Sequence, residues 1–256
     1  MRRDYAITRS YRNTFLLEIA IGVIEILVYF YISRTFTQGS TGNLHGAPSY
    51  FDFAVVGIIV TIVIGATSTE LASRVRQEQL AGTLEALFLQ PLTTMEVTLG
   101  LVAVPFIFAM VRAVVYLTIA AAFLGLVVTH ANWLGAGLML IVTGAAMCAI
   151  GIAAGAFVLV VRRGAYFSGM LLFAMGFVSG AVFPASVLPD WVQPIGAIVP
   201  TRFAYDGLRS TLFKGSDWGG DVLTLALFAA IGVSVAIFLF AGALSLSKRR
   251  ASLAQY

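Results

Sequence analysis

The chain has 256 residues, of which 59% are hydrophobic and only 11% are charged, with a formal net charge of +4. A soluble domain carries roughly 25% charged residues, so this composition excludes an ordinary soluble protein and indicates several membrane crossings. The single cysteine, Cys148, lies in an apolar run. We therefore predict no disulfide framework and no cysteine-based metal site, and we interpret Cys148 as a small packing residue.

Six segments are long and apolar enough to cross about 30 Å of hydrocarbon as helices of roughly 20 residues. They are Phe15–Ser33, Phe53–Thr69, Val97–Val128, Trp133–Val161, Ala165–Phe183 and Leu223–Leu246. The second must begin near Phe51 to reach full length. The third is long, so we expect it to project beyond the membrane or to kink at Pro105, which lacks a backbone donor. A tight turn, "THAN" at 129–132, separates the third and fourth. These features predict one all-α polytopic membrane domain over residues 1–256.

Orientation follows from Lys and Arg, which concentrate in cytoplasmic segments. With both termini inside, eleven of the sixteen basic residues lie on the inner side, four lie outside, and Arg112 falls within a span. We therefore predict cytoplasmic termini. Segment 1–14 carries four Arg and is predicted either as an interfacial helix on the anionic inner surface or as a basic topogenic tail. Phe15–Ser33 contains two glutamates and ends in no small-x-small site, so we interpret it as a retained span and not a signal peptide.

Three charged side chains fall inside predicted spans. Glu18 and Glu25 are seven residues apart and share one face of the first helix, and Arg112 lies midway along the third. A charge at mid-bilayer costs about 2.5–3.5 kcal/mol on the insertion scale, so each charge needs a partner or water. We favour an ion pair between Arg112 and either glutamate that clips the two helices together. The alternative is a polar path for substrate or protons.

The sequence lacks the usual catalytic motifs. It has no G-x-x-x-x-G-K-[ST] phosphate loop and no H-E-x-x-H, and its two histidines fall on the predicted outer side. We therefore expect no catalytic residue, metal or cofactor in this chain. The spacings Gly151-x-x-x-Gly155 and Gly176-x-x-x-Gly180 predict close helix packing, either within the bundle or between subunits.

An apolar outer segment, residues 184–222, holds four of the seven prolines. A solvated linker would be more polar, so we predict two short helices, Pro189–Val199 and Thr201–Phe213, with Thr201 as the N-cap of the second. Irregular backbone at membrane depth is tolerated where protein or a water-filled cavity covers it, which makes this re-entrant pair a candidate outer gate. An interfacial aromatic anchor is the alternative.

An inner segment, residues 70–96, is the most charged run between two spans. Its apolar positions at helical spacing are Leu80, Leu84, Leu87 and Phe88. Glu78 and Glu85 fall on other faces, so the pattern predicts an amphipathic helix along the inner membrane surface that ends near Pro91. A helix that is charged on its cytoplasmic face and joined to two spans is suited to receive force from a soluble partner.

Two motifs resemble those of ABC-2 type transporter permeases. One is "EQLAGTLEALFLQPLTTMEVTLG", residues 78–100, which resembles the cytoplasmic coupling segment of that family. The other is "VFPASVLPDWVQPIGAIVPTRFAYDGLR", residues 182–209, which resembles its outer signature. They lie before span three and between spans five and six, and the resemblance extends over essentially the whole chain.

The resemblance implies six helices per subunit, a dimer of permease subunits, and two copies of a separate ATP-binding-cassette subunit that holds the ATP and Mg. The residues it suggests for ATPase coupling are Glu78, Gly82, Thr83, Leu84, Glu85 and Pro91. Those it suggests for the outer gate are Pro184, Pro189, Trp191, Pro200 and Arg209.

The function expected from these features is that of the permease subunit of an ATP-driven exporter in the prokaryotic cytoplasmic membrane. The substrate would be amphipathic: lipid-like, a glycan-lipid or a drug. Apart from the ATPase and a second permease subunit, the partners expected are membrane lipids, and no nucleic acid. The alternative is a scaffold or regulatory subunit that docks an ATPase without moving substrate. A passive channel is disfavoured because no ring of carboxylates is visible in the spans.

Overall fold

The computed structural model describes residues 2–35, 44, 46–81, 94–128, 130–160 and 164–249, and these residues form helices and connections with no strand among them. The predicted all-α class is confirmed. The long helices are α1 Arg2–Ser33, α2 Tyr50–Ala81, α4 Thr94–Phe123, α5 Trp133–Val160, α6 Gly164–Val178 and α9 Gly219–Arg249. Between α6 and α9 lie the short elements η1 Ala185–Val187, α7 Gln193–Ile198, α8 Pro200–Arg209 and η2 Ser210–Lys214.

Five of the six predicted spans are confirmed as helices long and apolar enough to cross a membrane, counted over the described residues. They are Phe15–Ser33, Tyr50–Thr69, Ala103–Phe123, Trp133–Val160 and Gly219–Leu246. The fifth predicted span is shorter than expected, because α6 has 15 residues and is only about 22 Å long. The described structure therefore does not reproduce six full spans. The third span, α4, continues as a helix through Pro105.

Two helices end before their predicted boundaries for the same local reason. After α4, the Leu126 N–H reaches back to the Ala120 carbonyl at 3.1 Å while Gly125 adopts φ +74°. After α6, the Ala181 N–H reaches back to the Gly176 carbonyl at 3.1 Å while Gly180 adopts φ +79°. In both turns a glycine in the left-handed region ends the helix. After α6, the bond from Ala181 to Gly176 and the 3.3 Å bond from the Gly180 N–H to the Phe177 carbonyl together form a Schellman motif. The α4–α5 connection is consequently longer than the predicted four-residue turn, and Gly180 lies outside the helix in which its spacing placed it.

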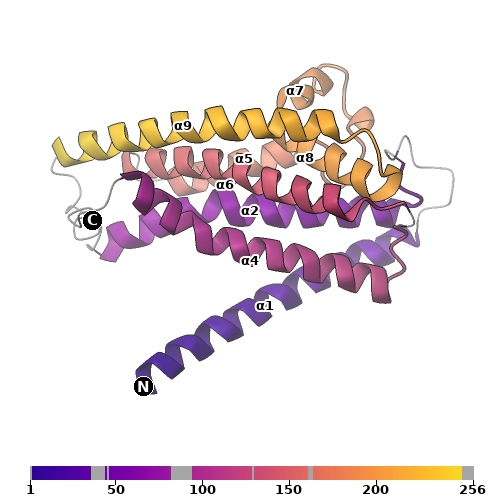
Figure 1. Cartoon of the computed structure of the whole chain (residues 1–256), viewed down its shortest axis with the longest axis horizontal. Coiled ribbons are helices and arrows are strands. Elements are labelled where there is room, and N and C mark those ends of the chain that lie inside the picture. The colour runs from indigo at the N-terminus through magenta and orange to yellow at the C-terminus, as the bar shows by residue number, and fades with distance from the viewer. Residues whose placement is uncertain are drawn as a thin grey trace.

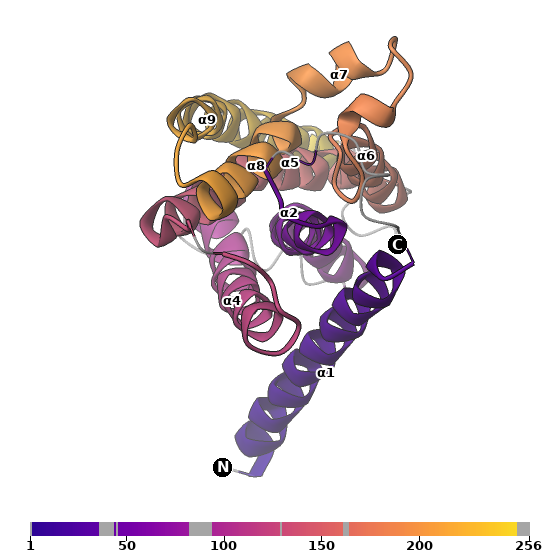
Figure 2. The ribbon, with the colours of Figure 1, turned by 90° about the vertical axis from the view of Figure 1, so that its right-hand side faces the viewer.

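The helices form a bundle around α2. Viewed along the bundle, α2 lies in the middle with α4, α5, α6 and α8 around it, while α1 runs obliquely along the outside (Figure 2). The α2 and α5 spans are largely buried, whereas the α1 and α9 spans are mostly exposed. The first residues of α1 and the last residues of α9 lie at one end of the bundle's long axis (Figure 1). We call this the terminal end, and the opposite end, which holds the α1–α2, α4–α5 and η2–α9 connections, the loop end.

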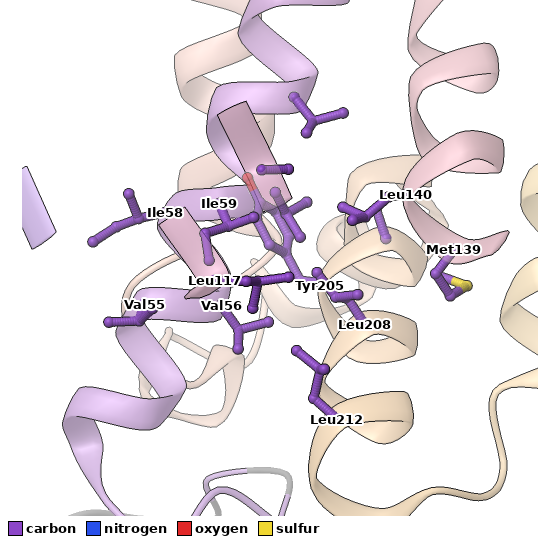
Figure 3. Packing of buried hydrophobic residues seen from close by; sticks show 14 of the residues in the cluster. Val55, Val56, Ile58, Ile59, Leu117, Met139, Leu140, Tyr205, Leu208 and Leu212 are labelled. Carbon is purple, nitrogen blue, oxygen red and sulfur yellow. The ribbon is translucent and has the colours of Figure 1, made fainter. Parts of the chain in front are cut away.

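The core is centred on the loop-end half of α2, where every residue from 51 to 60 is buried. Val56 and Ile59 of α2 lie near Tyr205 and Leu208 of α8 and Leu140 of α5 (Figure 3). A second apolar cluster joins α5 to α9 and includes Cys148, whose thiol is free and buried. The interpretation of Cys148 as a packing residue is confirmed.

Two polar caps fasten the loop end. Ser49 and Asp52 form a capping box at the start of α2, and the Asp52 carboxylate also accepts the Val127 N–H at 3.1 Å. Asn132 caps α5 by accepting the Gly135 N–H at 2.9 Å, and its own N–H binds the Thr211 carbonyl at 2.8 Å. These bonds join the α4–α5 connection to α2 and η2, so the loop end is held by defined polar contacts.

The predicted close packing at Gly151 is present in the bundle. A Cβ at this position would lie 2.7 Å from the Thr67 carbonyl oxygen and 3.0 Å from the Ser68 Cα. The Ser68 hydroxyl also donates to the Met147 carbonyl at 3.2 Å across the same contact. The α2 and α5 backbones therefore approach each other closely because Gly151 has no side chain.

Replacing Gly151 with alanine tests this packing. Overpacking costs about 1–3 kcal/mol, so Gly151→Ala should lower the thermal unfolding temperature of the purified protein. Gly65→Ala is the matched control, because no atom lies within 4 Å of its added Cβ. Alanine is also favoured over glycine in a helix, so Gly65→Ala should leave the unfolding temperature unchanged or higher. Equal effects of the two substitutions would contradict the close approach.

Candidate functional site

The inner segment is continuous with the second span. α2 is a single helix of 32 residues, about 48 Å long, and it passes Thr69 and ends at Ala81 inside the predicted coupling segment. Up to Ala81 this segment is therefore an extension of α2. Glu78 lies in the last turn of α2, and its side chain is outside the description. The other predicted coupling residues lie outside the described residues: Gly82, Thr83, Leu84, Glu85 and Pro91.

At the loop end, Arg209 is the most heavily bonded of the predicted gate residues. Its side chain is 1% exposed, although it comes from α8 and carries a charge. One terminal nitrogen donates to the Gly180 carbonyl at 3.0 Å, and the other donates to the carbonyls of Ala181 at 2.7 Å and Phe53 at 3.3 Å. The guanidinium carbon lies 3.5 Å from the centre of the Phe53 ring. Arg209 thus joins α8, the turn after α6 and the first turns of α2.

The charge of Arg209 is balanced by few groups of opposite sign. Its closest described carboxylate oxygen is that of Asp206, 4.0 Å away, and Asp206 also pairs with Arg202 at 3.3 Å. Most of the balance comes from carbonyl dipoles and the ring face of Phe53. A planar group with five N–H donors is suited to bind several carbonyls at once, which a lysine ammonium cannot do in the same geometry.

The turn after α6 fits against α2 at a glycine. A Cβ at Gly57 would collide with the Ala181 carbonyl oxygen, and it would lie 2.9 Å from the Arg209 guanidinium. The left-handed Gly180 directs the Gly180 and Ala181 carbonyls toward that guanidinium. The sequence analysis did not single out Gly57. Gly57 lies one helical turn after Phe53. That spacing indicates a role for Gly57 only once the structure shows Arg209 packed against both residues.

Hydroxyl groups add two links within this region. Thr201 does not cap α8, because the N-cap is Val199 and Pro200 occupies the first turn. The Thr201 hydroxyl instead contacts the Ser179 hydroxyl at 2.5 Å, and it donates to the Met175 carbonyl at 3.3 Å. The predicted capping role is therefore wrong. Pro200 has no N–H to satisfy at the first helical position, and the Arg202 N–H donates to the Val199 carbonyl at 3.0 Å.

A second hydroxyl link joins α2 to α8. The Thr61 hydroxyl lies 3.0 Å from that of Tyr205, which is otherwise buried among apolar side chains. Neither residue was predicted as part of a site. Both carry ordinary side chains for their elements, so the sequence pattern offers no signal for the pair.

The remaining predicted gate residues are spread over the outer segment. Pro184 is buried beside η1, Pro189 is exposed, and Pro200 begins α8. Trp191 is 74% exposed, just before the protruding α7 (Figure 2). The predicted first helix is shorter than expected, since α7 begins at Gln193, while the second is present as α8 and η2. The structure brings Arg209 into the core and leaves Trp191 on the surface.

The intramembrane charges form the predicted clip. Arg112 of α4 binds the Glu18 carboxylate of α1 at 2.8 Å, and the Tyr116 hydroxyl donates to the Glu18 carbonyl at 3.0 Å. Gly22 faces the Tyr116 ring so closely that an added Cβ would collide with it. Glu25 makes no ion pair with any described residue. The partner of Arg112 is therefore Glu18, and α1 is fastened to α4 where the two helices cross.

The side-chain contacts of this region link helices to one another. Among the described residues, no group of three His, Cys, Asp or Glu side chains could hold a metal ion. The bonded groups connect α1 to α4, and α2 to the turn after α6 and to α8. Comparison with protein families gives a match to the ABC-2 type transporter family over residues 3–213. The chain belongs to this family. A comparison with curated proteins finds no match.

As a member of this family, the chain is the membrane component of an ABC transporter. Permeases of this class associate with an ATP-binding subunit. The match ends at Phe213, and so it includes the inner segment and α8 with Arg209. Both motifs on which the resemblance rests lie inside the matched residues.

Removing the Arg209 side chain should destabilise this ABC-2 chain. Arg209→Met leaves three carbonyls without that donor, and an unsatisfied buried polar group costs about 1–3 kcal/mol. We expect the thermal unfolding temperature in detergent to fall by several degrees, with only partial recovery in Arg209→Lys.

Arg202→Met is the matched control for Arg209. Arg202 lies on the same helix, but it forms a partly exposed ion pair with Asp206, and surface ion pairs are worth about 0–1 kcal/mol. Its substitution should barely shift the unfolding temperature. If the Arg209 and Arg202 variants unfolded at the same temperature, the bracing role of Arg209 would be wrong.

A double-mutant cycle tests the clip. Arg112→Leu and Glu18→Leu should each reduce folded yield and unfolding temperature, because each leaves its partner charge unpaired in the membrane. The double variant should recover most of the loss. Glu25→Leu is the control on the same helix face and should show no coupling to Arg112→Leu. A rescue by Glu25→Leu in place of Glu18→Leu would contradict the observed pairing.

Proposed function

We propose that this chain is the permease subunit of an ATP-driven exporter that works as a homodimer with two copies of a separate ATP-binding subunit. The observation that carries the proposal is the continuity of α2, which runs as one helix from the loop-end core into the inner segment of an ABC-2 family member. A rigid helix of this kind is suited to transmit movement between a cytoplasmic partner and the far side of the bundle.

We assign ATP binding and hydrolysis to the separate ATP-binding subunit. The sequence has no phosphate-binding loop of the G-x-x-x-x-G-K-[ST] type, so ATP and Mg would be bound by the ATP-binding subunit. The segment that receives its movement is 70–96. Glu78 and Glu85 would make polar contacts there, and Gly82 would permit close approach. Thr83, Leu84 and Pro91 complete the coupling segment of this proposal.

The Arg209 contacts suggest how movement reaches the outer segment. Arg209 binds the Phe53 carbonyl of α2 together with the two carbonyls after α6. A tilt of α2 at its inner end would therefore displace the turn after α6 and α8 together. In this scheme the outer segment 184–222 opens and closes as a unit. Pro184, Pro189, Trp191 and Pro200 shape the gate, and Arg209 ties it to α2.

The substrate path is proposed to lie between the two permease subunits. α6 exposes bulky apolar side chains in the single subunit, with Met170 at 73% and Phe173 at 77% exposure. A second subunit facing α1, α2 and α6 would enclose a path suited to an amphipathic substrate, such as a lipid-like molecule, a glycan-lipid or a drug. Glu18 and Arg112 are assigned to the α1–α4 clip, and Glu25 is left to face the path or its entrance.

The proposed location is the prokaryotic cytoplasmic membrane with the terminal end in the cytoplasm. Two observations support this orientation. The start of α1 and the end of α9 lie at the same end of the bundle (Figure 1), and eleven of the sixteen basic residues are predicted from the sequence to fall on that side. Such an excess of Lys and Arg is typical of cytoplasmic segments.

The experiment that tests the proposal is coupled ATPase activity. The chain is co-purified with candidate ATP-binding subunits of the same source and reconstituted in lipid vesicles. We expect bound ATPase whose activity depends on the permease, and we expect Glu85→Arg and Gly82→Trp each to abolish that dependence through charge reversal and steric block. Gly242→Trp on α9 is the control, since this position lies outside both the inner and the outer segment and its side chain enters open space.

Three outcomes separate the possibilities. Loss of coupling in both inner variants but not in Gly242→Trp supports the proposed transmission. Absence of ATPase binding, or wild-type behaviour of both inner variants, rejects it. ATPase binding without movement of any amphipathic probe across the vesicle membrane favours the scaffold alternative.

A further inference from the structure

A groove lies between the loop-end halves of α4 and α5 and encloses about 480 Å³. α5 packs mainly against α2 and α9 and makes few contacts with α4, which leaves this space open. The groove is lined by one stripe on each helix. The stripes are Val114, Leu117, Thr118 and Ala121 on α4, and Trp133, Ala136, Gly137 and Leu140 on α5. Each repeats at i, i+3, i+4 and i+7, so one face of each helix forms one wall.

The groove is predominantly apolar. Thr118 is its only hydroxyl, and this group donates to the Val114 carbonyl at 2.8 Å. Small side chains widen the groove at Ala121, Ala136 and Gly137. A Cβ added at Gly137 would meet no atom within 4 Å, so this position opens directly into the space. A dry apolar cavity of this kind is filled by hydrocarbon and not by water.

The dimensions match one leaflet of a bilayer. Eight residues of helix, from Trp133 to Leu140, extend about 12 Å, and one leaflet of a 30 Å hydrocarbon core is about 15 Å deep. The groove begins at the loop end with Trp133, which is 58% exposed, and an amphipathic aromatic side chain is typical of the membrane interface. It runs inward along α4 and α5, both of which are membrane-length helices.

The lipid that surrounds these two spans is the occupant closest at hand. Both walls of the groove belong to membrane-length helices, so the hydrocarbon chains of the bilayer reach it directly. The groove also opens onto large exposed apolar side chains of the two spans, such as Val114 and Leu138, which form the lipid-facing surface on either side.

We infer that this groove binds an acyl chain of a phospholipid from the leaflet at the loop end. The acyl chain fills the space between α4 and α5 that the protein side chains leave open. The site is separate from the Arg209 contacts and from the α1, α2 and α6 surfaces assigned to the substrate path. It does not depend on the proposed function, because it rests on the geometry of two membrane spans.

Tryptophan fluorescence tests this inference on the full chain. The protein has three tryptophans, so Trp191→Phe with Trp218→Phe leaves Trp133 as the single reporter. The delipidated protein in detergent is titrated with phosphatidylcholine whose acyl chains carry bromine, which quenches tryptophan on contact. We expect saturable quenching, and we expect Gly137→Leu in the same background to raise the apparent Kd about tenfold or more by filling the groove.

Two variants keep the test decisive. Gly242→Leu on α9 is the matched control, because its side chain enters open space outside the groove. Ala121→Leu fills the groove from the opposite wall and replaces Gly137→Leu if that variant is not monodisperse. Unsaturable quenching, or equal quenching in the groove-filling and control variants, overturns the inference. So does efficient disulfide dimer formation in membranes by Gly137→Cys with Cys148→Ser, since a second copy would then cover this face.

Discussion

The structure depends on one buried arginine, Arg209, which donates hydrogen bonds to backbone carbonyls at the point where α6 ends. α6 stops after 15 residues, so the chain must reverse while still beside α2, where exposed backbone groups are expensive. Arg209 satisfies the two carbonyls of that reversal and a third on α2, and its charge is spread over their dipoles and the Phe53 ring. The guanidinium lies where three features meet. These are the early end of α6, the left-handed Gly180 and the absence of a side chain at Gly57.

This interaction gives the two halves of the bundle different mechanical properties. At the loop end, α2 is bonded to the turn after α6, to α8 and to the α4–α5 connection, through Arg209, Thr61 and Asp52 respectively. Toward the terminal end, α1 diverges from the bundle and is fastened near the crossing with α4 by Glu18 and Arg112 (Figure 1). A helix that is braced at one end and continuous into the inner segment at the other is suited to the transmission that we propose. α1 also packs on α2, where the Phe30 and Phe51 rings lie 5.2 Å apart.

The sequence predicted some parts of this arrangement correctly for clear physical reasons. Transfer of each long apolar segment into lipid depends on its own composition, so five spans were predicted without knowledge of their neighbours. The need to neutralise Arg112 also follows from its position alone. Other features could not be predicted in this way. Gly125 and Gly180 lie in apolar runs that read as helix, and only the observed backbone turns show that each ends one. Thr201 fits a capping pattern, yet its hydroxyl is used by Ser179 from another element.

By itself, the sequence determined that this is a polytopic helical membrane protein with two motifs of the ABC-2 type, because composition, periodicity and motif spacing are properties of short stretches. Only the tertiary structure decided which groups meet. It chose Glu18 over Glu25 as the partner of Arg112, placed Arg209 in the core and Trp191 on the surface, and left a groove between α4 and α5. These outcomes depend on how helices distant in sequence cross one another. If a crossing angle changed, or if a helix ended one residue earlier or later, a different side chain would face the neighbouring helix. The local sequence pattern does not determine these angles and ends.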